Sequence, residues 1–108
     1  MPETERYTFR GSYIPERMMP GIERYVKYGI IPGSFLQAII CNELKEAFIC
    51  ADDENFVNIA AYVNYFYNNV PRAAWGSRGI MEAWSEGIKK RRAEELSKQW
   101  LKRNHETN

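Results

Sequence analysis

Apolar residues recur at spacings of three and four along most of this chain, and this spacing constrains the fold more than any other feature. It is clear over residues 36–51, 56–67 and 80–88. Side chains spaced in this way lie on one face of a helix. The sequence therefore predicts an all-α protein, a compact bundle of four to five helices.

Prolines, glycines and capping residues set the bounds of the first two helices. Pro20 is tolerated only in a first helical turn and Gly29 suits a left-handed C-terminal cap, so we expect the first helix between them. Ser34 is the predicted N-cap of the second helix, and Asn42 should kink or restart that helix. Anion binding at the "PGS" turn is the alternative role, although the lysine of a phosphate-binding loop is missing.

The remaining caps predict a third helix and a long last one. Asp52 or Asp53 caps the third helix, the loop "NNVPRAAWGS" ends it, and Ser77 caps the last helix. Both cysteines fall within the apolar pattern of the second helix, so each is expected to be a small buried side chain. Cys41 and Cys50 are nine residues apart, on opposite faces of a continuous helix, and should not form a disulfide with each other.

The length of 108 residues suits one domain, with an N-terminal arm at 1–13, a core at 14–88 and a polar helical extension at 89–108. A short strand is possible at "RYTFRGSYI" in and after the arm. Residues 34–69 carry five acidic residues against one lysine, and residues 83–108 carry seven basic residues against four acidic ones. The two charged blocks can pair within one molecule, pair between copies, or leave the basic extension for an anionic partner.

Several function classes are disfavoured by what the sequence lacks. No run of about 20 apolar residues exists to span a membrane and "MPETERYTFRG" lacks a signal-peptide core, so a cytoplasmic, reducing setting is expected. His105 is the only histidine, which disfavours histidine catalysis and multi-histidine metal sites. The adjacent carboxylates of "DDE" at 52–54 fan out around a helix start rather than converge. We therefore expect no enzyme activity, no metal and no cofactor.

Basic and aromatic residues around the first helix form the candidate binding site. Arginine forks onto phosphate and aromatic rings stack on bases, so such a group suits a nucleotide-like ligand. Amides and rings near the end of the third helix and in the next loop add further candidates. Pairing of the arginines with Glu16 and Glu23, and capping by the asparagines, are the structural alternatives. The predicted ligand-binding residues are Arg17, Arg24, Tyr25, Tyr28, Asn68 and Trp75.

The last helix carries a second candidate surface, a row of apolar residues separated by multiples of four: Trp84, Ile88, Leu96 and Trp100. This row either docks on its own domain or binds a second copy or another protein, and the sequence leaves these alternatives open. The "KKRR" run at 89–92 would suit nucleic acid. On a helix, however, four consecutive charges spread around the whole circumference, so nucleic-acid binding is a minor alternative.

One resemblance adds a biological setting. The segment "IPERMMPGIERYVKYGIIPGSFLQAIICNELKEAF", followed by "ADDEN", "YN", Pro71 and "WGS", resembles a group of small bacteriophage and prophage proteins over roughly residues 14 to 84. Where that group has "NEAP", this chain has "NNVP" at 68–71. The resemblance implies a phage setting, in which small accessory proteins act by binding a host component, and it transfers no residue role.

The expected function is that of a non-enzymatic phage accessory protein of the counter-defence kind. It would sequester a nucleotide-like signalling molecule in the host cytoplasm, as a homo-oligomer with its pocket at an interface between copies. The alternative is an inhibitor or adaptor that binds a host protein through the C-terminal helix.

Overall fold

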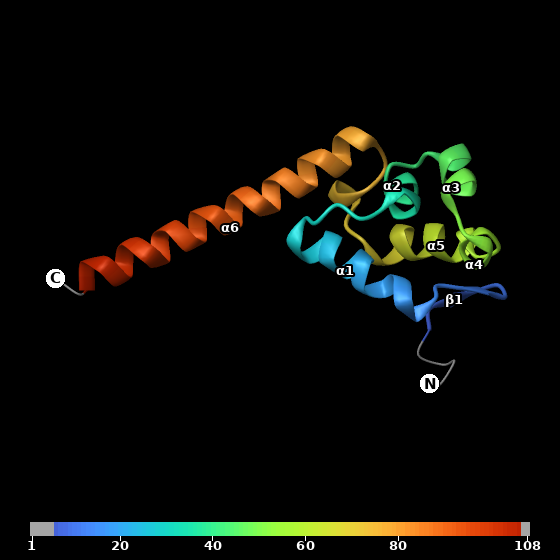
Figure 1. Cartoon of the computed structure of the whole chain (residues 1–108), viewed down its shortest axis with the longest axis horizontal. Coiled ribbons are helices and arrows are strands. Elements are labelled where there is room, and N and C mark those ends of the chain that lie inside the picture. Colours follow the sequence, from blue (N-terminus) through green and yellow to red (C-terminus); the bar gives the residue numbers. More distant parts are fainter. Residues whose placement is uncertain (1–5, 107–108) are drawn as a thin grey trace.

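The computed structural model describes residues 6–106 and confirms the predicted helical class (Figure 1). Within that range, the structure has six α-helices, two short 3-10 helices and one two-stranded hairpin. The elements in chain order are β1 (Thr8–Phe9), β2 (Ser12–Tyr13), η2 (Glu16–Met18), α1 (Met19–Tyr28), α2 (Ser34–Ile40), α3 (Leu44–Cys50), α4 (Asp53–Phe56), α5 (Ile59–Asn69), η3 (Arg72–Ala74) and α6 (Arg78–Glu106).

The expected strand near the N-terminus is present as an antiparallel hairpin. Thr8 pairs with Tyr13, and Arg10 and Gly11 form the two-residue turn with φ values of 49° and 85°. Positive φ at both central residues is what a tight hairpin turn requires. The hairpin packs on α5, where the ring of Tyr7 meets that of Tyr65 edge to face at 5.1 Å.

Two predicted helices are each divided in two, which is why the structure has more helices than expected. Asn42 adopts a left-handed φ of 59° and restarts the chain as α3, as one of the two predicted outcomes. The break between α4 and α5 was not predicted from the sequence. Asn58 there accepts a hydrogen bond from the Tyr13 backbone N–H at 2.9 Å and donates to the Glu54 carbonyl at 2.9 Å. The Asn58 side chain thus joins the hairpin to α4, and its hydrogen bonds to backbone groups compete with continuation of the helix.

Most predicted caps are confirmed. Gly29 ends α1 with a left-handed φ of 69°, Asp52 accepts a hydrogen bond from the N–H of Asn55, and the Ser77 hydroxyl accepts one from Ile80. The prediction for Ser34 was wrong by one residue, because Gly33 occupies the N-cap position of α2 and Ser34 begins the helix.

The core lies where α1, α2, α5 and the first turns of α6 meet. Its largest fully buried side chains include Tyr25, Tyr62, Phe66 and Met81. Cys41 is buried with them, but Cys50 is exposed at the end of α3, so the prediction of burial was wrong for that residue. Because Asn42 starts α3 as a helix separate from α2, the two helices do not share one apolar face: Ala47 is the buried residue of α3, and Cys50 lies on its exposed side.

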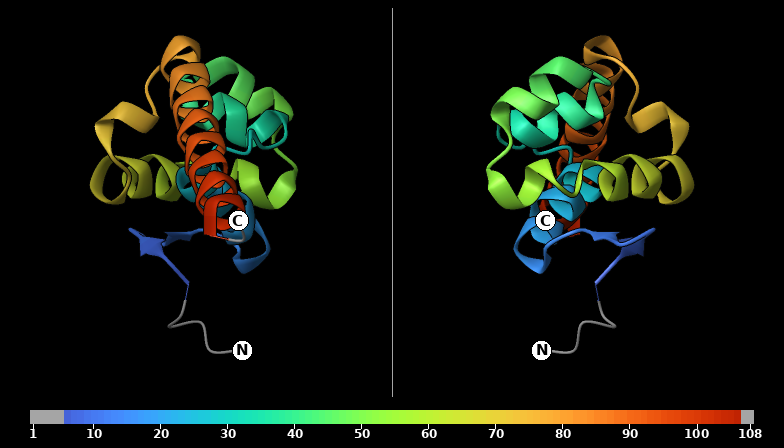
Figure 2. Two further views of the ribbon diagram at one scale, coloured as in Figure 1. Left: turned by 90° about the vertical axis from the view of Figure 1, so that its left-hand side faces the viewer. Right: turned by 90° about the vertical axis from the view of Figure 1, so that its right-hand side faces the viewer.

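The last helix leaves the domain. Met81, Ser85 and Ile88 are buried, whereas every residue from 89 to 103 is exposed. Figure 1 shows α6 running outward from the rest of the fold, and the left view of Figure 2 looks at it from its C-terminal end. The resulting molecule measures 60 × 34 × 22 Å. No helix in residues 6–106 combines the length and apolar character needed to cross a membrane.

Candidate functional site

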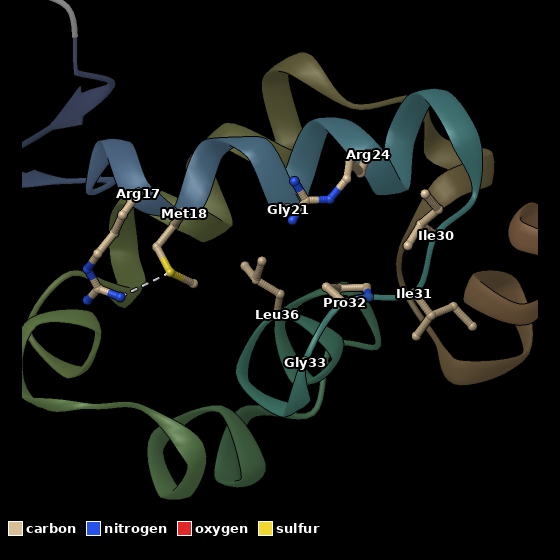
Figure 3. Close-up of a pocket in the computed structure, with 9 residues that line it drawn as sticks. All are labelled: Arg17, Met18, Gly21, Arg24, Ile30, Ile31, Pro32, Gly33 and Leu36. Carbon is tan, nitrogen blue, oxygen red and sulfur yellow. Dashed lines mark hydrogen bonds between the residues drawn. The ribbon is translucent and has the colours of Figure 1, made fainter.

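The residues predicted to form one binding site are distributed over several places. Arg17 and Arg24 line a pocket of about 260 Å³ between η2, α1 and the loop before α2 (Figure 3). Tyr25 is fully buried and its hydroxyl donates to the Ala74 carbonyl at 2.5 Å, while burial raises the pKa of that hydroxyl. Tyr28 is exposed and lies 5.2 Å from the Arg92 guanidinium.

Arg17 has protein partners on the neighbouring segment. Its guanidinium lies 2.9 Å from Asp52 and 3.1 Å from Glu54. The Asn55 backbone N–H and then Arg17 lower the pKa of Asp52, and the Tyr13 hydroxyl and then Arg17 lower the pKa of Glu54. These contacts hold η2 against α4, so a ligand would compete with two carboxylates for this arginine.

Arg24 is the remaining cation of this pocket. It is exposed and forms no ion pair with any residue in the described part of the chain. The other walls are aliphatic or glycine, with Ile31, Pro32 and Leu36 opposite the helix (Figure 3). Because no aromatic ring lines it, this pocket offers a charge for an anion but no surface on which a base can stack.

Trp75 lies in a second and larger pocket. This pocket, of about 670 Å³, is lined by Asn42, Tyr67, Arg72, Trp75, Gly76 and Ile80. The Trp75 ring packs against Phe66 at 5.8 Å, which fixes its orientation, and the Gly76 N–H donates to the Ile40 carbonyl at 2.7 Å. The "PRAAWGS" loop is thereby held against Ile40, the last residue of α2.

The chemistry of the larger pocket suits a planar anion. Tyr67 is 70% exposed, and Arg72 forms no ion pair within residues 6–106. No carboxylate lines the pocket. Two aromatic rings and an uncompensated guanidinium are groups that stack on a base and bind a phosphate. We refer to Tyr67, Arg72 and Trp75 as the ring–arginine site.

Sequence reasoning found only part of this site. Trp75 was predicted, and Tyr67 belongs to the aromatic and amide group noted near the third helix, but Arg72 was missed. The sequence does place Arg72 three residues before Trp75 in the same loop, and this spacing could have indicated that the two belong to one site. Asn68 does not line either pocket, because its amide donates to the Asn64 carbonyl at 2.9 Å in the last turns of α5.

The four apolar residues of the last helix are divided by its departure from the domain. The Trp84 indole N–H donates to the Val26 carbonyl at 3.3 Å, and Ile88 is buried. Leu96 and Trp100 are 60% and 63% exposed on the projecting part. The first pair therefore holds α6 on its own domain, and the second pair is accessible to another molecule.

No group of three or more histidine, cysteine, aspartate or glutamate residues in the described part of the chain is arranged to hold a metal ion. Comparison with protein families, curated proteins and solved structures finds no match to this chain.

Proposed function

We propose that this protein is a non-enzymatic binding protein that sequesters a small, planar, anionic molecule of the nucleotide class in the ring–arginine site. The observation that carries the proposal is the joint lining of one pocket by Tyr67, Trp75 and an Arg72 without an ion-pair partner in the described structure. Stacking of a base on an aromatic side chain contributes about 1–3 kcal/mol. A guanidinium adds a forked, charge-assisted contact to phosphate.

The lining of the pocket favours retention of the ligand over its conversion. None of the six lining residues is a carboxylate, histidine, lysine or cysteine, the usual groups for general acid–base or nucleophilic chemistry. Together with the resemblance to small phage proteins, this supports a counter-defence role in which a host signalling nucleotide is withdrawn from its receptor. Such a role places the protein in the host cytoplasm.

The test is calorimetric titration with a panel of purine and pyrimidine nucleotides and dinucleotides. Arg72→Gln should weaken binding of the preferred nucleotide at least tenfold, because it removes the charge and the fork. Tyr67→Leu should weaken it through the loss of stacking, and at 70% exposure this change leaves the core intact.

Arg24→Gln is the matched control, since it removes an exposed arginine from the other pocket. Binding should persist in this variant. Loss of binding in Arg24→Gln with full binding in Arg72→Gln would move the site to the pocket of Figure 3. Absence of binding by the wild-type protein across the panel would refute the proposal.

The second candidate function is an inhibitor or adaptor that binds a host protein through α6. The exposure of Leu96 and Trp100 beyond the edge of the domain favours it. Deletion of residues 89–108 separates the two functions, because nucleotide binding should survive the deletion and capture of a host protein should not.

A further inference from the structure

Helices α3 and α4 lie at the end of the molecule opposite the tip of α6 (Figure 1), and they carry exposed apolar side chains. The rings of Phe48 and Phe56 meet there edge to face at 5.0 Å, although they are 39% and 50% exposed. Leu44 and Ile49 on α3 are 65% and 62% exposed, and Val57, which directly follows α4, is 70% exposed. We call these five residues the α3–α4 patch. The contact between Phe48 and Phe56 joins the exposed apolar residues of α3 to those at the end of α4, and exposed apolar patches mark interaction surfaces.

The surroundings of this patch are acidic. Glu46 lies on α3 and Asp53 begins α4, and neither forms an ion pair with any residue in the described part of the chain. Lys45 is the only basic residue between positions 43 and 57, against five acidic ones. Three of these five are paired with arginines outside the patch, Glu43 with Arg78 and both Asp52 and Glu54 with Arg17, which leaves the charges of Glu46 and Asp53. An apolar surface with an acidic rim fits an apolar segment with basic flanks.

The projecting part of α6 has that composition. Residues 89–103 carry seven basic side chains and two acidic ones, and Leu96, Trp100 and Leu101 are the large apolar residues among them. With a rotation of about 100° per residue these three cover one side of the helix, and Lys98 and Arg103 flank that side on either edge. All five are exposed.

The geometry excludes an intramolecular contact between the two surfaces. The α3–α4 patch lies at the other end of the fold from the tip of the straight helix α6 (Figure 1). Direct pairing of two projecting helices is disfavoured by charge, because it would bring two strongly basic segments together. A second copy of the chain, by contrast, presents an acidic apolar surface.

We propose that the projecting part of α6 docks on the α3–α4 patch of a second copy, with Trp100 as the apolar anchor. Trp100 lies twelve residues beyond Ile88, the last buried residue up to position 103, which corresponds to about 18 Å along the helix. Trp100 is therefore well clear of its own domain, and its 63% exposure leaves it accessible to a second copy. A reciprocal exchange of helices closes a two-fold dimer and covers both apolar surfaces of each copy.

The first test measures mass by light scattering across a concentration series. The wild type should have twice the monomer mass, and Trp100→Glu and Leu44→Glu should each yield monomers at the same concentration. Both replaced side chains are more than 60% exposed, so circular dichroism should show unchanged folding. Val63→Glu, at an exposed apolar residue of α5 outside both the patch and the ring–arginine site, is the matched control and should remain dimeric.

Charge reversal then identifies the pairing. Lys98→Glu with Arg103→Glu on the helix, and Glu46→Lys with Asp53→Lys on the patch, should each weaken dimerisation alone. An equimolar mixture of the two variants should regain the dimer, because each helix then faces a patch of opposite charge.

Three outcomes would overturn the proposal. If the wild type is a monomer at all concentrations, α6 does not bind a second copy, and a host protein becomes its expected partner. A dimer that Trp100→Glu dissociates and Leu44→Glu does not would indicate pairing between the helices. A mixture of the charge-reversed variants that stays monomeric would show that these two surfaces do not meet.

Discussion

Replacement of Gly29 by alanine is expected to destabilise the fold more than any other single methyl addition at a glycine of this chain. Gly29 has a φ of 69°, and its N–H donates to the Tyr25 carbonyl at 2.9 Å to close α1. A Cβ at this position would lie 2.8 Å from the Ser85 carbonyl oxygen and 3.1 Å from the Ser85 Cα. These are backbone atoms of α6, which cannot rotate away as a side chain would.

Two costs combine in this variant. The left-handed conformation costs a residue with a Cβ about 1–2 kcal/mol, and overpacking a close contact costs about 1–3 kcal/mol. The sum is about 2–5 kcal/mol, a large part of the roughly 5–15 kcal/mol that stabilises a typical domain. At about 4–8 °C per kcal/mol for a domain of this size, Tm should fall by roughly 10 °C or more.

Thermal and urea unfolding followed by circular dichroism measure the effect. Gly87→Ala is the matched control, because no atom lies within 4 Å of its added Cβ and it lies within α6. It should stabilise the protein by about 0.5–1 kcal/mol through helix propensity. Gly29→Asn separates the two costs, since asparagine tolerates the left-handed region but retains the Cβ. Near-wild-type stability of Gly29→Ala would refute the close approach of α1 and α6, and full rescue by asparagine would refute the clash.

Two further predictions concern hydrogen bonds and acid. Tyr25→Phe leaves the buried Ala74 carbonyl without its hydroxyl donor and should lower the free energy of unfolding by about 1–3 kcal/mol in urea titrations. The pKa values of Asp52 and Glu54 are lower in the folded protein than in the unfolded chain, so their contribution to stability is present above about pH 4 and is lost as the pH falls through the folded values. A series of Tm measurements should show this decline, and Asp52→Asn with Glu54→Gln should make it shallower; an unchanged slope would contradict the assignment.

The sequence predicted those features whose cause lies within a few residues. Gly29 as a left-handed cap, Asp52 and Ser77 as N-caps and the apolar faces of the helices all have local causes, and the structure confirms them. The break before α5 has a distant cause, because Asn58 binds the backbone of Tyr13, 45 residues earlier. A helical pattern read along the chain cannot reveal such a contact.

In the candidate site, too, the features with local causes were predicted and those that depend on distant residues were not. Arg17 and Arg24 are seven residues apart and do line one pocket, as their spacing on one face suggests. The carboxylates that hold Arg17 are 35 and 37 residues away, and no local pattern connects them to it. The ring–arginine site likewise depends on a loop that returns to α2 through the Gly76 contact. The sequence therefore predicted Trp75 but not Arg72 as a member of this site.

The projecting half of α6 is helical although every residue from 89 to 103 is exposed, and this has a consequence for binding. A helix in isolation must first form a turn that is costly to nucleate. Here the buried residues Met81, Ser85 and Ile88 fix the first turns, and the following residues, rich in lysine, arginine and glutamate, need only extend the helix. A binding partner, whether a second copy or a host protein, therefore meets a helix that is already formed. Less ordering entropy is lost on association than with a disordered tail, so even the small apolar surface of Leu96, Trp100 and Leu101 can contribute to a specific contact.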